Sequence, residues 1–106
     1  MSESFIYITC ADDREAETIG GMLVQSRLAA CVNILPGMKS LYWWQGKLER
    51  GEEVVLIAKT RTELVDELTE AVKAAHGYEV PCVVSLPITS GNADFLRWIR
   101  EETGRE

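Results

Sequence analysis

The chain has 106 residues, of which 46% are hydrophobic, and it carries a formal net charge of −6. This length allows one globular domain with its own core, so we expect a single domain over residues 1–106. The acidic balance excludes a protein that binds nucleic acid or an anionic membrane, because either surface would need a basic patch.

Targeting and cysteine patterns indicate an ordinary soluble protein. Residues 1–4 lack a basic segment followed by an apolar run, and no apolar stretch reaches membrane-spanning length, so we expect a cytoplasmic location. The three cysteines, Cys10, Cys31 and Cys82, show no CxxC spacing. They predict free thiols, not a disulfide framework or a structural zinc site.

The first strand and helix are marked by composition and spacing. Residues 5–10 are β-branched and aromatic, which is typical of a central strand. Asp12 offers an N-cap with Glu15 three residues later, which predicts the start of a helix. The apolar stripe of this helix is Ala16, Ile19, Gly20 and Leu23, and the glycine in it indicates a closely packed neighbour.

A long β-hairpin follows. Residues 28–34 predict a strand, and Pro36-Gly37 predicts a bulge or bend within it. Gln45-Gly46 is the expected turn, and residues 54–58 form a continuous buried run on the return arm. The arms together span about residues 29–60, far more than the roughly 5–6 residues of a typical strand, so the tip should project beyond the sheet.

The tip of this hairpin carries more aromatic surface than one face can bury. Leu41 and Trp43 alternate with Tyr42 and Trp44, so both faces are apolar. The expected cover is another copy of the chain, since each tryptophan would leave on the order of 200 Å² to be covered. An ordinary core hairpin in a monomer is the alternative.

The next segment predicts a second amphipathic helix. Thr60 and Glu63 form a candidate capping box, and apolar residues recur at helical spacing from Leu64 to Ala75. His76 falls in the last turn, where a protonated ring would favour the helix dipole, and Gly77 is placed as the C′ residue.

The C-terminal part completes the fold. Residues 78–81 predict a rigid connector, residues 82–88 a fourth strand, and Asn92 the cap of a last helix with an apolar stripe of Phe95, Leu96, Trp98 and Ile99. The order βαββαβ plus a terminal helix predicts an α+β, ferredoxin-like domain. Such a domain has a four-stranded antiparallel sheet with two helices on one face.

Three runs of the chain carry a resemblance to a known family. They are Arg27-Leu28-Ala29-Ala30-Cys31-Val32-Asn33-Ile34, Tyr42-Trp43-Trp44-Gln45-Gly46-Lys47 and Tyr78-Glu79-Val80-Pro81. With Pro87-Ile88, Gly91 and Leu96-Arg97-Trp98, they make the chain resemble the CutA divalent-cation-tolerance family over nearly its whole length. The resemblance implies a tight homotrimer formed through the long hairpin, with Tyr42, Trp43 and Trp44 at the trimer interface.

The resemblance also implies a function. Members are associated with tolerance of copper and other divalent cations. The expected ligands are therefore metal ions, and the expected process is the response to metal. The assembly is similar to that of trimeric nitrogen-signalling proteins, which bind small effectors between subunits. A non-enzymatic trimeric scaffold or signalling module that binds an effector or a protein at intersubunit clefts is therefore the alternative.

Cys10 and His76 are the candidate ligands for copper or another divalent cation, because copper ions favour thiolate and imidazole. In bacterial relatives, the cysteine proposed for copper ends the first strand; Cys10 lies two residues beyond that position, on the same face. We expect the end of the first strand to lie away from the start of the last. Cys10 and His76 would then meet only across a subunit boundary.

The remaining polar residues predict no catalytic site. One histidine and no nucleophile motif leave the chain without a nucleophile, base and orienting group, so we expect no enzyme. Lys59, Tyr78 and Glu79 are candidates for an intersubunit cleft, with salt bridging and a satisfied hydroxyl as the alternatives. Cys31, within Ala-Ala-Cys-Val, fits a small buried hydrophobe better than a ligand.

Overall fold

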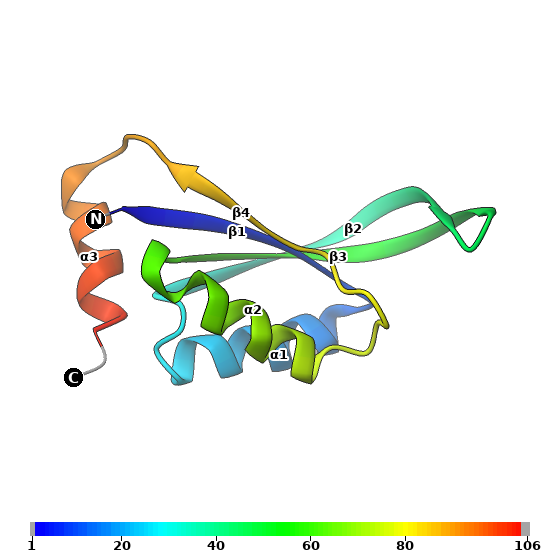
Figure 1. Cartoon of the computed structure of the whole chain (residues 1–106), viewed down its shortest axis with the longest axis horizontal. Coiled ribbons are helices and arrows are strands. Elements are labelled where there is room, and N and C mark those ends of the chain that lie inside the picture. The colour runs from blue at the N-terminus through cyan, green and yellow to red at the C-terminus, as the bar shows by residue number, and fades with distance from the viewer. Residues whose placement is uncertain (1, 105–106) are drawn as a thin grey trace.

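A computed structural model of the chain describes residues 2–104. Its four strands form one antiparallel sheet in the order β2-β3-β1-β4, and α1 and α2 lie on one face of it (Figure 1). The third helix, α3, stands at the end of the sheet near the N-terminus (Figure 1). This arrangement confirms the predicted α+β, ferredoxin-like fold with an added helix. The elements are β1 (Glu3–Cys10), α1 (Asp13–Gln25), β2 (Cys31–Trp44), β3 (Lys47–Arg61), the 3₁₀ turn η1 (Thr62–Leu64), α2 (Val65–Ala75), β4 (Val83–Ile88) and α3 (Ala93–Glu102).

The core lies between the sheet and the two helices. Ile6 and Ile8 are two residues apart in β1, so both point toward the helices, and both are fully buried, as is Leu56 of β3. Gly20 allows α1 to approach the sheet, because a Cβ there would lie 3.0 Å from Val32 Cγ2 and 3.1 Å from Leu56 Cδ1. The close neighbour predicted from this glycine is therefore the sheet itself. The buried stripe of α1 is the predicted one, Ala16, Ile19, Gly20 and Leu23.

The hairpin of β2 and β3 projects well beyond the rest of the sheet (Figure 1). Cys10, the last residue of β1, lies opposite Val54, so the hairpin beyond this point has only two strands. Gln45 and Gly46 form the predicted turn, with φ values of 51° and 80°. The turn lies at one end of a chain whose longest dimension is 44 Å.

An irregularity in β2 sets which residues face which side of the hairpin. Leu35 lies opposite Val55 and Met38 opposite Glu53, so β2 carries one extra residue at this point. This is the bulge predicted from Pro36-Gly37, and Gly37 has a φ of 85°. Since neighbouring side chains point to opposite faces, the extra residue exchanges the two faces for every residue beyond it.

The predicted capping box at Thr60 and Glu63 is wrong. Thr60 lies in β3, opposite Ser4 of β1, and its side chain is fully buried. The strand continues to Arg61, and α2 begins at Val65 without a side-chain cap. Pairing with a central strand outweighs the local capping preference, because a cap contributes only about 1 kcal/mol.

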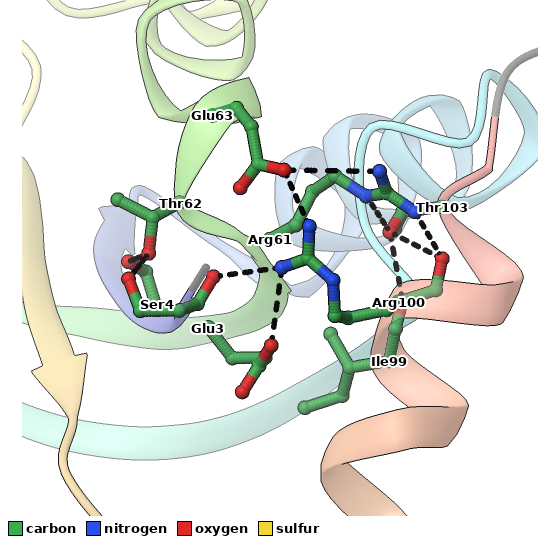
Figure 2. A network of polar contacts seen from close by, with 9 residues as sticks. Glu3, Ser4, Arg61, Thr62, Glu63, Ile99, Arg100 and Thr103 are labelled. Atoms are coloured by element: carbon green, nitrogen blue, oxygen red, sulfur yellow. Dashed lines mark hydrogen bonds and ion pairs between the residues drawn. The ribbon is translucent and has the colours of Figure 1, made fainter.

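Polar contacts fix α3 against the sheet (Figure 2). Arg61 of β3 donates from Nε to the Thr103 hydroxyl at 3.0 Å and also donates to the carbonyl of Arg100. Arg100 in turn pairs with Glu3 of β1 at 3.1 Å and with Glu63 of η1. Hydrogen bonding to Arg100 lowers the pKa of Glu63. These contacts join α3 to β1, β3 and η1 and leave the opposite end of the sheet to the candidate site.

Candidate metal cluster and the adjoining hollow

Three potential metal ligands converge at the end of β1. Cys10 ends β1, Glu15 lies in the first turn of α1, and His76 follows α2; one ligand atom of each lies within 4.8 Å of the others. The expectation that Cys10 and His76 meet only across a subunit boundary is wrong. Antiparallel neighbours place the end of one strand beside the start of the other, and Ile8 near the end of β1 lies opposite Val83 at the start of β4. The connector into β4 therefore brings His76 to Cys10 within one chain.

His76 is held by two backbone groups. Its side chain is fully buried, and Nε2 lies 2.8 Å from the Thr9 carbonyl oxygen, which can only accept. Nε2 must therefore carry a proton. Nδ1 accepts from the Tyr78 N–H at 3.0 Å, so the ring is neutral in this arrangement. The predicted interaction of a charged ring with the helix dipole is thus replaced by two hydrogen bonds.

Glu15 and Cys10 complete the cluster. Glu15 accepts from the N–H groups of Ala11 and Gly77, each at 2.8 Å. A Cβ at residue 77 would lie 3.0 Å from Glu15 Oε2, which explains the glycine there better than the predicted left-handed C′ position. Burial, with the nearby charge of Glu15 and then Asp12, raises the pKa of the Cys10 thiol to about 12. Sequence reasoning missed Glu15 as a ligand because its capping role already explained it.

The donor set fits a metal ion after two exchanges. A metal-ligating histidine usually donates its other ring N–H to a carbonyl or carboxylate, as His76 Nε2 does to Thr9. Its Nδ1 lies 3.6 Å from Glu15 Oε2, so imidazole, carboxylate and thiol face one point. An ion there would have to replace the Tyr78 N–H on Nδ1 and the proton of Cys10. His76, Cys10 and Glu15 would hold it.

A hollow lies directly beside this cluster. It has a volume of about 340 Å³ between the hairpin and the connector, and a second hollow of about 450 Å³ adjoins it across Tyr42, Tyr78 and Val80. The ring of Tyr78 lies 4.6 Å from that of His76, between centroids, so the cluster and the hollow share a wall. The first hollow is lined by Tyr42, Trp44, Gly77, Tyr78, Glu79 and Val80.

Tyr78 is fixed at its hydroxyl as well as at its backbone. The phenol donates to Glu53 Oε2 at 2.8 Å, so this residue links the connector to β3. Burial first, and then the hydrogen bond and charge of Glu53, raise the pKa of Tyr78. The phenol therefore stays protonated, and remains a donor, throughout the neutral range.

The other predicted site residues lie apart from this pair. Lys59 donates to Asn33 Oδ1 at 2.8 Å and lies 5.8 Å from the centre of the Phe95 ring, so the described chain does not bring it to Tyr78 or Glu79. Trp43 is 73% exposed, whereas Tyr42 and Trp44 turn toward the hollow. The remaining free thiols, Cys31 and Cys82, are partly buried and lie outside the cluster.

Comparison with known proteins places the chain in a family. The sequence profile described as "CutA1 divalent ion tolerance protein" matches residues 4–102. The chain belongs to the CutA1 family. Its sequence is 48% identical to the divalent-cation tolerance protein CutA of Thermus thermophilus over 102 residues, which cover 96% of this chain and 99% of that protein.

CutA1 structures share the whole fold. That of Thermus thermophilus superposes with a TM-score of 0.93, over 96% of this chain and 99% of that one, at 48% identity. That of Xylella fastidiosa gives a TM-score of 0.95 at 38% identity and covers 98% of this chain and all of that one.

Some relatives are longer than this chain. It matches "Protein CutA 1, chloroplastic" of rice at 46% identity over 92% of its own length but only 55% of the relative, and it spans 57% of the human protein CutA at 42% identity.

No helix within residues 2–104 is both long and apolar enough to cross a membrane.

Proposed function

We propose that this CutA1-family protein contributes to divalent-cation tolerance by binding copper at Cys10, Glu15 and His76. The observation that carries the proposal is the convergence of the three ligand atoms within 4.8 Å in one chain. Thiolate and imidazole favour copper over hard ions such as Mg²⁺, while a carboxylate alone would not discriminate in this way. The role is that of a binding protein, in keeping with relatives named for tolerance and not for a reaction.

Copper binding at this site is expected to weaken as the pH falls. Cys10 must lose its proton to the solvent when the ion binds, and its raised pKa increases the cost of that loss at neutral pH. His76 must exchange the Tyr78 N–H for the ion. Both steps cost free energy, so moderate affinity and a steep pH dependence are the signature of this site.

A homotrimer is the assembly that we propose for this function. The two-stranded part of the hairpin leaves Leu41, Trp43 and Leu48 each more than half exposed, and a neighbouring copy would cover them. An arm that packs on the next subunit makes a contact that must close into a ring or continue as a filament. The family resemblance favours a ring of three. A cytoplasmic location stays a prediction; relatives carry names that include "chloroplastic" and "periplasmic".

The test is calorimetric titration with Cu(I), under ascorbate and without competing thiols. The parent protein should bind about one ion per chain, and Cys10→Ser and His76→Gln should each weaken binding at least about tenfold, in the range found when metal-site residues are altered. Cys82→Ser removes a thiol outside the cluster and is the matched control. Unchanged affinity and stoichiometry in both cluster variants, with circular dichroism confirming that they fold, would show that the cluster is purely structural.

A second candidate function rests on the hollow. A volume of about 340 Å³ with aromatic walls is in the range of small-ligand sites, so a module that binds an effector there is the alternative to metal binding. Tyr78 and Glu79, the predicted cleft residues, line this hollow, and Lys59 does not. The two candidates are separable, because copper and an effector would contact different side chains.

A further inference from the structure

Two consecutive backbone N–H groups of the connector between α2 and β4 are bonded to the candidate metal cluster. The Gly77 N–H donates to Glu15 Oε2 at 2.8 Å. The Tyr78 N–H donates to His76 Nδ1 at 3.0 Å. Glu15 and His76 are two of the three ligands of the cluster, so the connector occupies hydrogen-bonding positions on both.

The two acceptor atoms differ in how many partners they can take. A neutral imidazole has a single lone pair on its unprotonated nitrogen, so His76 Nδ1 can bind either the Tyr78 N–H or an ion, but not both. A carboxylate oxygen has about two lone-pair positions, so Glu15 Oε2 can keep the Gly77 N–H while it acts as a ligand. Ion binding therefore excludes one of these hydrogen bonds and leaves the other in place.

His76 is not free to turn and present Nδ1 elsewhere. Its side chain is fully buried, and Nε2 donates to the Thr9 carbonyl oxygen at 2.8 Å. A turn of the ring would break this bond and leave a buried carbonyl unsatisfied, which is costly. The Tyr78 backbone is therefore the part that has to move when an ion reaches Nδ1.

A third contact holds Tyr78 in place. Its hydroxyl donates to Glu53 Oε2 at 2.8 Å, and Glu53 lies opposite Met38, where the two-stranded part of the hairpin begins (Figure 1). Since the backbone and the side chain of Tyr78 are anchored to different elements, a shift of the backbone away from His76 strains the hydroxyl contact. The hydroxyl contact therefore opposes ion binding. All these contacts lie within one chain, so they do not depend on which surfaces an assembly covers.

We propose that Tyr78 is a positioning residue for the metal cluster, whose N–H leaves His76 Nδ1 when copper binds. We call this hydrogen bond, together with the hydroxyl bond to Glu53, the connector lock. Gly77 is the hinge of the movement, because it has no side chain and stays bonded to Glu15. Copper occupancy is thereby coupled to the position of the connector. This inference rests on the proposed function, since the ion that displaces the Tyr78 N–H is the one held by the cluster.

The direct test is NMR spectroscopy of the assembled, ¹⁵N-labelled protein, without metal and after saturation with Cu(I), which is diamagnetic. An N–H···N hydrogen bond gives a scalar coupling between its two nitrogens. Tyr78 N and His76 Nδ1 should therefore be coupled in the metal-free protein and uncoupled in the loaded protein. The Tyr78 amide hydrogen should exchange with solvent at least about tenfold faster after loading, because exchange reports local opening. The Gly77 amide is the internal control and should keep its exchange rate.

Tyr78→Phe tests the hydroxyl anchor. It removes the donor to Glu53 without a change of charge, so calorimetry should show Cu(I) binding about two- to tenfold tighter, in line with the net contribution of one hydrogen bond. A hydroxyl with a purely structural role would leave the affinity unchanged or lower it. Tyr7→Phe makes the same change at a hydroxyl that bonds Met38 Sδ, and it should bind copper as the parent does. Circular dichroism and light scattering verify the fold and assembly of each variant.

The outcomes separate the connector lock from the proposed function. No coupling in the metal-free protein, a coupling that survives copper binding, or an affinity of Tyr78→Phe at or below that of the parent would overturn the lock and leave the proposed function standing. Absence of Cu(I) binding in both the parent and Tyr78→Phe would overturn both. Binding in Tyr78→Phe alone would support the lock and show that it closes the site of the parent.

Discussion

Replacing His76 by alanine should destabilise the protein severely. The change leaves the Thr9 carbonyl and the Tyr78 N–H without their partners at a buried position. An unsatisfied buried polar group costs about 1–3 kcal/mol. The lost ring contact with Tyr78, at 4.6 Å between centroids, adds about 0.5–1.5 kcal/mol. We therefore expect a loss of roughly 3–7 kcal/mol, a large share of the 5–15 kcal/mol that stabilises a typical domain.

Urea unfolding followed by far-ultraviolet circular dichroism measures this loss. Protomer concentration must be held constant, because assembly couples it to stability. Lys73→Ala, in the last turn of α2, is the control. The Lys73 side chain is exposed and pairs with Glu70 at 3.4 Å, so its loss should cost no more than about 0.5 kcal/mol. A loss below about 1 kcal/mol for His76→Ala would refute the two hydrogen bonds and the locked neutral ring.

Three further predictions concern packing, titration and assembly. Gly21→Ala should stabilise α1 by up to about 1 kcal/mol, because nothing lies within 4 Å of the added methyl group. Gly20→Ala should lose that gain or destabilise the protein, because its Cβ would lie 3.0 Å from a side chain of the sheet. Thermal melts of the two variants compare them directly. The pKa of the Cys10 thiol is about 12 in the folded chain, against an ordinary value of 9.0. The contribution of this thiol to the free energy of unfolding is therefore complete below pH 9 and is lost as the pH rises toward 12. Over that range the parent protein should lose up to ~4 kcal/mol more stability than Cys10→Ala. The measurement is urea unfolding of the parent protein and of Cys10→Ala at pH 8 and pH 11. If the thiol were accessible, the free energy of unfolding would fall by the same amount in both proteins. Trp43→Ser should weaken the trimer because it removes the most exposed aromatic side chain of the hairpin; light scattering that gave a monomer mass for the parent would contradict the proposed assembly.

Local patterns predicted most of the fold. Helical spacing gave the buried stripe of α1, and Gln45-Gly46 gave the turn, because both depend on neighbouring residues. Thr60 misled because its capping preference is local, whereas its place in β3 is decided by pairing with Ser4, 56 positions earlier in the chain. The sequence alone cannot weigh a long-range strand pair against a nearby cap.

The candidate site was predicted only in its parts. Cys10 and His76 were chosen for their chemistry, but their contact depends on how β1, α2 and β4 come together. Glu15 joins them for the same reason. Of the hollow, only the connector residues Tyr78 and Glu79 were predicted as cleft residues. Its other wall comes from Trp44 on the hairpin, and neither segment of the sequence indicates the other.

The bulge at Pro36-Gly37 limits how the length of the hairpin can vary in evolution. The one extra residue places Tyr42 and Trp44, not Trp43, on the face of the hollow. Loss of a single residue from the bulge would exchange the two faces along the whole outer arm. An insertion or deletion of two residues beyond the bulge would keep each aromatic residue on its own side. Length changes in this arm should therefore be accepted in pairs, and an odd change would need a second, compensating bulge.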